Sequence, residues 1–193
     1  LSKRTFDIVL AGLALVLLMP LFLLVTILIK LDSKGPAFFR QRRRGFNLEE
    51  FGIWKFRTMT TLDDGDDIQQ AQENDRRVTR VGRFLRKSSI DELPQLLNVL
   101  RGEMSLVGPR PHAVAHDRFF EKRISLYPRR LNVKPGITGW AQVNGFRGAT
   151  ETDDLMRQRV DHDLYYIDNW SLVFDIYIVM LTVLSRKSMR NAY

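Results

Sequence analysis

The chain contains no cysteine. This excludes a disulfide framework, a thiolate zinc site and a cysteine nucleophile, and it fits a reducing compartment. Histidine is also scarce, because only His112, His116 and His162 occur, which argues against a histidine-rich metal centre. The sequence has no internal repeat and no low-complexity tract. It begins with Leu1 in place of methionine, so we expect it to be an excerpt of a longer protein.

Acidic residues are outnumbered by basic ones. The 193 residues include 30 Lys and Arg against 22 Asp and Glu, which gives a formal net charge of +8. With 45% hydrophobic residues the chain is too apolar for a disordered protein, and its length suits one folded unit. The positive charge predicts an anionic partner, which can be a phosphorylated substrate, an acidic lipid surface or a nucleic acid.

Charge is missing altogether from residues 8–29, an apolar run long enough to cross a bilayer. Three interpretations compete: a cleaved signal peptide, a membrane-spanning helix, and a helical hairpin that enters and leaves on one face. No small-residue cleavage site follows Ile29, which argues against the signal peptide. Pro20 lies near the middle of the run and predicts a kink, which leaves two arms that are each too short for a crossing.

Basic residues flank this run on both sides, and such residues favour the cytoplasmic face of a membrane. A straight span violates this preference at one end, whereas a hairpin satisfies it at both. The flanking residues are Lys3 and Arg4 before the run, and Lys30, Lys34, Arg40, Arg42, Arg43 and Arg44 after it. The pattern favours the hairpin over the signal peptide and leaves the spanning helix as the alternative.

The rest of the chain predicts a mostly α-helical fold with a few short β-strands. Strands are expected at residues 37–41 and 51–59, the second of which alternates apolar and polar residues. Helices are expected at residues 79–87, 90–100, 118–131, 155–169 and 171–184, with Pro128 interrupting the third. The first is basic and amphipathic, and the last is apolar enough to lie against a membrane or the core. Residues 60–75, rich in Asp, predict a solvated loop.

The first candidate site is the pair Asp91 and Glu92, which follows Ser89. Ser89 and Glu92 have the spacing of a helix capping box, so a purely structural role is one interpretation. The start of a helix also attracts phosphate, and one carboxylate beside it can attack phosphorus while the other holds a divalent cation. The two interpretations are compatible with each other.

A second candidate feature is an excess of basic side chains near this pair. Arg110 stands between two prolines, which limits its backbone freedom and suits a positioned phosphate-binding fork. The other members are Lys55, Arg57, Arg76, Arg77, Arg80, Arg83, Arg86, Lys87 and Arg147. A diphosphate or a nucleic acid would explain them. The apolar run and the lack of any nucleic-acid-binding motif argue against nucleic acid.

The third candidate is the stretch of residues 134–145, KPGITGWAQVNG. Its glycines and proline are typical of an ordinary turn region. The alternative is a loop that holds a base or a sugar, with Trp140 as a stacking surface. Periodicity alone leaves both interpretations open.

Together these residues resemble the bacterial sugar transferase family, the monotopic polyprenol-phosphate phosphoglycosyltransferases. The resemblance covers nearly the whole chain. Within the family, the details GPRPH and GWAQVNGFRG are most similar to undecaprenyl-phosphate glucose-1-phosphate transferases of exopolysaccharide and colanic acid synthesis. The motifs are Lys3-Arg4-x-x-Asp7, the apolar run broken at Pro20, KFRTM at 55–59, SSIDELPQLLNVLRGEMSLVGPRPH at 88–112 and VKPGITGWAQVNGFRG at 133–148.

The resemblance implies a chemistry for the acidic pair. Asp91 is expected to attack the β-phosphorus of a UDP-sugar, releasing UMP and forming a phosphosugar-aspartate that undecaprenyl phosphate then attacks. Mg²⁺ is implied, with Glu92 as its main ligand and Asp91 and Asp163 as further ones. Arg86 and Arg110 match phosphate-site arginines, and the phosphate-binding assignment extends to Lys55, Arg57 and Arg147.

The resemblance also implies an architecture. Residues 1–32 are expected to form a re-entrant membrane helix broken at Pro20, and residues 33–193 a cytoplasmic catalytic domain packed on the membrane with interfacial amphipathic helices. The family has a Ser-Pro pair at the break, where this chain has Met19-Pro20, so the serine hydroxyl is missing. The implied location is the cytoplasmic face of the bacterial inner membrane, among anionic lipids. The sequence leaves a homo-oligomer open.

Two other functions remain as alternatives. One is a non-catalytic, basic scaffold for polysaccharide assembly at the membrane surface, against which the intact pair Asp91 and Glu92 argues. The other is an inverting glycosyltransferase, which makes no phosphoenzyme and releases UDP instead of UMP.

Overall fold

The computed structural model describes residues 2–60, 75–148 and 152–184. Helices predominate and the strands are short, as the sequence predicts. The α-helices are α1 (Ser2–Asp32), α2 (Arg80–Ser88), α3 (Gln95–Arg101), α4 (Val114–Glu121), α5 (Trp140–Val143), α6 (Asp153–Asp168) and α7 (Leu172–Leu184). The 3-10 turns are η1 (Phe46–Leu48), η2 (Ile90–Glu92) and η3 (Tyr127–Asn132). The strands are β1 (Phe38–Arg44), β2 (Glu50–Phe56), β3 (Ser105–Val107) and β4 (Gly136–Thr138).

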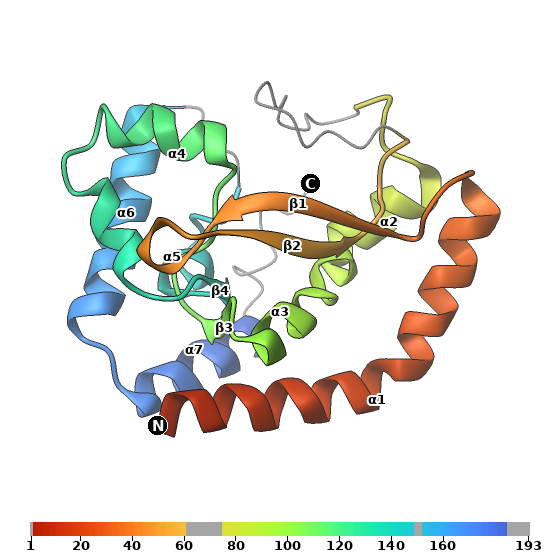
Figure 1. Cartoon of the computed structure of the whole chain (residues 1–193), viewed down its shortest axis with the longest axis horizontal. Helices are drawn as coiled ribbons and strands as arrows, with labels where there is room; N and C mark the ends of the chain where they lie inside the picture. The colour runs from red at the N-terminus through yellow and green to blue at the C-terminus, as the bar shows by residue number, and fades with distance from the viewer. Residues whose placement is uncertain (1, 61–74, 149–151, 185–193) are drawn as a thin grey trace.

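The apolar run forms one 31-residue helix, α1, with Pro20 inside it. Figure 1 shows α1 running beneath α7 and α3, bending sharply near its middle and continuing toward α2. A proline in a helix interior removes one hydrogen bond and clashes with the preceding turn, which accounts for a bend. The proline therefore redirects the helix without ending it.

Both arms of α1 pack against the rest of the chain. Ala11 in the first arm lies in a core cluster with Leu96 and Val99 of α3. Val25 and Ile29 in the second arm lie in another cluster with residues of β2 and α2. The outer side of the helix stays exposed, and α1 is the one helix in the described ranges that is long and apolar enough to cross a membrane. The exposed large hydrophobic residues of α1 are Ile8, Val9, Leu13, Val16, Leu17, Met19, Leu23, Leu24, Ile27, Leu28 and Leu31.

The start of α1 is fixed by polar contacts. The Nζ of Lys3 lies 2.6 Å from Oδ2 of Asp175 in α7, a carboxylate that is fully buried. Arg4 donates to the carbonyl oxygens of Val99 and Leu100 at the end of α3. The carboxylate of Asp7 accepts from the backbone N–H of Leu106 at 3.1 Å. The charged residues before the apolar run therefore tie the helix to the domain as well as marking its flank.

Two small sheets position the loops of the molecule. Strands β1 and β2 form an antiparallel hairpin in which Gln41 faces Ile53. Strands β3 and β4 pair in parallel, with Ser105 opposite Gly136, although the sequence favours a turn region at residues 134–145. A Cβ atom on Gly136 would lie 2.1 Å from the backbone nitrogen of Gly108, so the crossing requires glycine. This contact brings two Pro/Gly-rich segments together beside Arg110.

Several predicted boundaries shift. The helices expected at 79–87, 155–169 and 171–184 are confirmed as α2, α6 and α7. The helix expected at 90–100 divides into η2 and α3, and the one expected at 118–131 divides into α4 and η3. Of the acidic loop expected at residues 60–75, residues 61–74 lie outside the described residues.

Candidate active site

The acidic pair lies on the 3-10 turn η2, between α2 and α3. Ser89 ends α2 with a left-handed backbone, φ 58°, and its backbone N–H donates to the carbonyl of Arg86. The predicted capping box is therefore wrong, because Ser89 terminates one helix and its side chain caps none. Because the turn is tight, the side chains of Asp91 and Glu92 point toward strand β2 and toward the loops that follow β3 and α5.

Three basic side chains clasp the carboxylate of Glu92. Arg110 donates through both terminal nitrogens, at 2.6 Å to Oε1 and 3.1 Å to Oε2. The Nζ of Lys55 lies 3.0 Å from Oε1, and Nη2 of Arg147 lies 2.9 Å from Oε2. Burial opposes ionisation of Glu92, yet Arg110 and Lys55 hold its pKa well below the ordinary value. We call Lys55, Arg110 and Arg147 the basic clasp.

Asp91 lies in a different electrostatic environment. Across the described residues, no side chain donates a hydrogen bond to its carboxylate, which is half-buried. Burial and the neighbouring charge of Glu92 raise the pKa of Asp91 to about 6, although Lys55, Arg86 and Arg147 pull it down. Two adjacent carboxyl groups thus have pKa values pushed apart, a pattern typical of catalytic sites. Glu92 is held in its ionised form and accepts hydrogen bonds from the basic clasp, whereas Asp91 accepts none from the described side chains.

Other basic residues lie near the pair. Arg86 pulls the pKa of Asp91 down, and its Nη1 lies 3.7 Å from the sulfur of Met59. Arg43 of β1 lies close enough to both Lys55 and His112 to lower the pKa of each. The sequence presents Arg43 only as part of a basic flank, and its strand register is what turns it toward the site.

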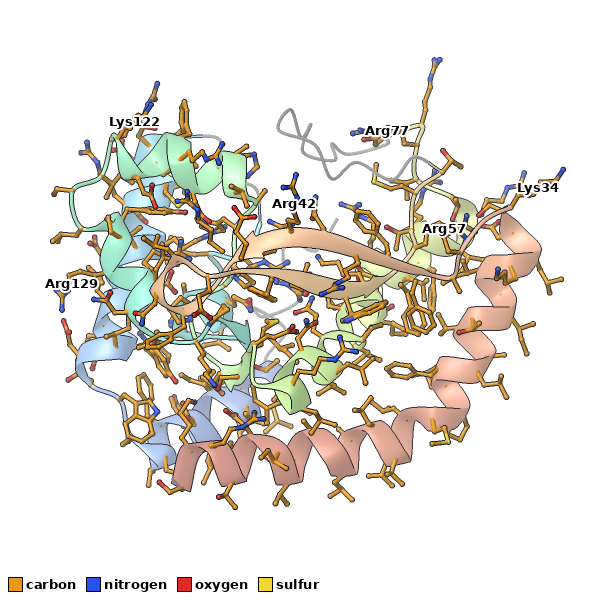
Figure 2. All side chains as sticks on the ribbon, viewed as in Figure 1. Lys34, Arg42, Arg57, Arg77, Lys122 and Arg129 are labelled. Carbon is orange, nitrogen blue, oxygen red and sulfur yellow. The ribbon has the colours of Figure 1, made fainter. Side chains whose placement is uncertain are left out.

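Arg57 is placed elsewhere. It is buried, and its guanidinium donates to the carbonyl oxygens of Ser33 and Lys34 in the turn after α1. Figure 2 shows Arg57 close to Lys34 at the end of α1. The structure therefore gives Arg57 contacts that hold the turn after α1 to the end of β2, and it does not bring this residue to Glu92.

Asp163 of α6 is likewise separated from the acidic pair. Its Oδ2 lies 2.7 Å from Nε of Arg130, and both side chains are 2% exposed. Burial raises the pKa of Asp163 in spite of this arginine. Within residues 2–60, 75–148 and 152–184, no group of three or more acidic or histidine side chains is close enough to hold a metal ion.

Asp91 and Glu92 still fit a magnesium ion bound together with a substrate. Mg²⁺ is commonly held by one or two carboxylates, several waters and the phosphates of a nucleotide. Glu92 can join such a set only by releasing part of the basic clasp, because both of its oxygens accept hydrogen bonds. The carboxylate of Asp163 is engaged with Arg130 and does not fit this set.

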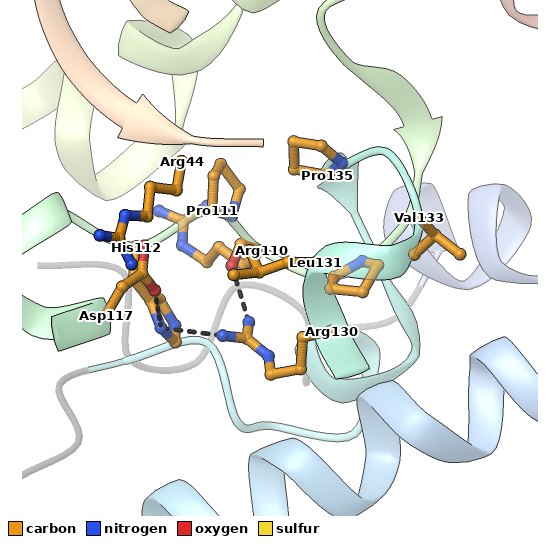
Figure 3. Close-up of a pocket in the computed structure, with 10 residues that line it drawn as sticks. Arg44, Arg110, Pro111, His112, Asp117, Arg130, Leu131, Val133 and Pro135 are labelled. Carbon is orange, nitrogen blue, oxygen red and sulfur yellow. Dashed lines mark hydrogen bonds and ion pairs between the residues drawn. The ribbon is translucent and has the colours of Figure 1, made fainter. Parts of the chain in front are cut away.

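A small pocket of about 10 Å³, roughly the space that one water molecule needs, lies next to the site. Figure 3 shows Arg130 joined to His112 and to the backbone of Arg110 among the residues that line it. The sequence does not single out Arg130 or Arg159 as site residues, because their partners come from distant segments. The lining residues are Arg44, Pro109, Arg110, Pro111, His112, Asp117, Arg130, Leu131, Val133 and Pro135.

Trp140 stacks on protein side chains. It begins α5, and its ring lies 5.1 Å from that of Phe174 and 6.2 Å from that of Tyr165, between ring centroids. Tyr177 lies 6.4 Å away. The structure therefore supports the packing interpretation of this residue over the base-stacking one.

Together these residues form an anion-binding site in which one carboxylate, that of Asp91, accepts no hydrogen bond from a described side chain. Lys55, Arg86, Arg110 and Arg147 supply four positive charges around two carboxylates. Such a site can bind a diphosphate and present a nucleophilic oxygen to phosphorus.

Comparison with known proteins agrees with this description. A family model described as bacterial sugar transferase matches residues 1–188. The chain is 57% identical over 193 residues to a UDP-glucose:undecaprenyl-phosphate glucose-1-phosphate transferase of Caulobacter vibrioides, covering 100% of this chain and 72% of that protein. Relatives of the same name from Xanthomonas campestris pv. campestris and Escherichia coli K12 are 53% and 51% identical over 193 residues. The chain spans 40% and 42% of their lengths.

Proposed function

This chain belongs to the bacterial sugar transferase family of phosphoglycosyltransferases, and from this premise we propose that it transfers glucose-1-phosphate from UDP-glucose to undecaprenyl phosphate and releases UMP. The relatives' names support the sugar and the lipid. The observation that carries the proposed mechanism is the contrast within the acidic pair. Glu92 is clasped by three basic residues, whereas the carboxylate of Asp91 has no hydrogen-bond donor in the described part of the chain.

The first step is the attack of Asp91 on the β-phosphorus of UDP-glucose. A bond forms between a carboxylate oxygen and phosphorus, and the bond from phosphorus to the bridging oxygen breaks. The electron pair stays on that oxygen, which leaves as part of UMP. The basic clasp exchanges its contacts with Glu92 for the diphosphate, since charge-assisted bonds to phosphate are of the same kind. Arg86 adds charge on the Asp91 side.

The second step regenerates the enzyme. An oxygen of undecaprenyl phosphate attacks the phosphorus held on Asp91, and the bond from phosphorus to the carboxylate oxygen breaks. The carboxylate returns with its electron pair, and the product is a lipid diphosphate sugar. When bound, Mg²⁺ would be held by Glu92 with Asp91 nearby and would neutralise charge on the phosphate oxygens.

The proposed location follows from α1. Its exposed outer side is apolar, its start is tied to the domain by Lys3, and its bend directs both arms along the same domain. These features support a re-entrant helix inserted from the cytoplasmic face of the inner membrane. A site at headgroup level then meets a soluble nucleotide sugar and a lipid phosphate together. A cysteine introduced at Ser2 should be labelled only from the cytoplasmic side; labelling from the periplasm would contradict this topology.

The activity is tested by identifying the nucleotide released from UDP-glucose, undecaprenyl phosphate and Mg²⁺, with UDP-galactose in parallel. We expect UMP from the wild type and from Asp154→Asn, an exposed control, and none from Asp91→Asn. Release of UDP would favour an inverting glycosyltransferase. Absence of turnover with every donor sugar tried would favour the scaffold.

A further inference from the structure

A buried polar cluster lies behind the basic clasp, centred on His112. Its members are His112, Asp117, Tyr127, Arg130, Arg159 and Asp163, each at most 8% exposed. They come from the loop after β3 and from α4, η3 and α6. Replacing a buried ion pair by packed apolar residues is often neutral or stabilising. Stability alone therefore gives little reason for two arginines here, and their contacts indicate another role.

Each arginine of this cluster holds the backbone of one loop of the basic clasp. Arg130 donates from Nη2 to the carbonyl oxygen of Arg110 at 2.8 Å. Arg159 donates from Nη2 to the carbonyl oxygen of Gly148, the residue after Arg147. The two loops whose side chains meet on Glu92 are therefore both anchored from behind.

The ring of His112 lies between the two arginines. Nη1 of Arg130 lies 3.0 Å from its Nδ1, and Nη1 of Arg159 lies 3.0 Å from its Nε2. Figure 3 shows Arg130 between His112 and the backbone of Arg110. Burial, together with Arg130 and Arg159, holds the pKa of His112 well below its ordinary value, so the ring is neutral. A neutral imidazole has one acceptor nitrogen and one donor nitrogen.

One tautomer satisfies the hydrogen bonds of Tyr127, Asp117 and Arg159 as a chain, and it gives Arg130 no bond to the ring, because Nδ1 carries the proton. Tyr127 donates to Oδ1 of Asp117 at 2.6 Å, which leaves its oxygen as an acceptor for Nδ1–H of His112 at 2.5 Å. Nε2 is then free to accept from Arg159. Arg130 takes its orientation from Asp163 and from the carbonyl of Arg110. His112 thus orients Arg159 directly, and Tyr127 and Asp117 fix the ring.

We propose that His112, Arg130 and Arg159 are positioning residues for substrate binding, which hold the backbones of the Arg110 and Arg147 loops so that both side chains converge on the diphosphate. Asp163 acts in this arrangement through Arg130. This inference rests on the proposed function, since it assigns the two loops to the nucleotide diphosphate. It predicts that disturbing the cluster weakens UDP-sugar binding more than it slows the chemical step at Asp91.

The test compares His112→Leu, His112→Gln and Arg159→Lys, with Val160→Ala as a control that shortens a buried core residue beside Arg159. We expect His112→Leu to raise the KM for UDP-glucose by about tenfold or more, with kcat within about threefold, the pattern of lost binding. His112→Gln should recover most of this, because its side-chain oxygen can accept from Arg159. Arg159→Lys should raise KM as well, because one ammonium lacks the fork that reaches two acceptors. Val160→Ala should lower the melting temperature and leave KM unchanged.

Unchanged KM in both His112→Leu and Arg159→Lys would overturn the inference, as would an equal rise in Val160→Ala. If His112→Leu does not fold, Arg159→Lys and His112→Gln carry the comparison. Calorimetric titration with UDP measures the same difference in binding without turnover. If the wild type released no UMP but the variants still bound UDP more weakly than the wild type, the proposed function alone would be refuted and the positioning role would stand.

Discussion

Glu92→Gln removes the charge that holds the basic clasp together while keeping the shape of the side chain. Glu92 is 6% exposed and accepts from Lys55, Arg110 and Arg147. Removing one partner of a buried ion pair typically costs about 3–5 kcal/mol, because the remaining charge is left uncompensated. We expect the free energy of unfolding to fall by about 3 kcal/mol, which for a chain of this size lowers Tm by roughly 6–12 °C.

The assay is thermal denaturation of the purified protein, with Glu121→Gln as a matched control. Glu121 pairs with Arg44 at 2.9 Å, and both side chains are partly exposed, at 25% and 17%. Such a pair contributes about 1 kcal/mol or less, so this control should lower Tm by only a few degrees. UDP should stabilise Glu92→Gln more than the wild type, because its phosphates replace the lost carboxylate. A Glu92→Gln protein that melts no lower than Glu121→Gln would refute this account of the clasp.

Three further predictions concern pH, Arg57 and the start of α1. Because the pKa of Asp91 is raised to about 6, the proposed nucleophile is protonated below that pH, and kcat/KM should rise as pH increases through about 6. A kcat/KM profile that is flat between about pH 5 and 7 would contradict this prediction. Arg57→Met removes the contacts to the carbonyls of Ser33 and Lys34 and should lower Tm while leaving the KM for UDP-glucose within about twofold, whereas a phosphate-binding role requires a large rise in KM. Lys3→Met leaves the fully buried Asp175 without its cation and should lower Tm, and the double variant with Asp175→Asn should melt higher than Lys3→Met alone.

The contribution of Glu92 to the stability of the protein also depends on pH. Its folded pKa lies below the ordinary value of 4.5, so its stabilisation is present above that pH and is lost as pH falls further. Glu92→Gln has no such carboxyl. The difference in Tm between the two proteins should therefore shrink as the solution is acidified below about pH 4.5.

Much of the helical fold follows from local sequence. The apolar run of α1 and the helices α6 and α7 are evident from composition and periodicity, and Pro20 predicts the bend. The pairing of β3 with β4 is not evident, because it joins two Pro/Gly-rich segments about thirty residues apart. The role of Ser89 is not evident from the sequence either. Its spacing to Glu92 matches a capping box, but its left-handed backbone is set by the turn between two helices.

The candidate site was predictable in its residue types and less so in its partners. Asp91, Glu92 and Arg110 follow from the sequence and the resemblance, and the structure brings Lys55 and Arg147 to them. Arg57 and Asp163 carry the same kinds of charge and lie in equally distinctive motifs, but their partners are a turn after α1 and a buried arginine. Those partners are fixed by tertiary packing, which a one-dimensional pattern does not contain.

The most direct test of the account follows the β-phosphorus of UDP-glucose. Protein incubated with Mg²⁺ and UDP-glucose labelled in the β-phosphate, without undecaprenyl phosphate, should become covalently labelled at Asp91 and release unlabelled UMP. Addition of undecaprenyl phosphate should then move the label from the protein to the lipid. Label that leaves as UDP, or that reaches the lipid at the wild-type rate in Asp91→Asn, would contradict the central claim that Asp91 carries the phosphosugar.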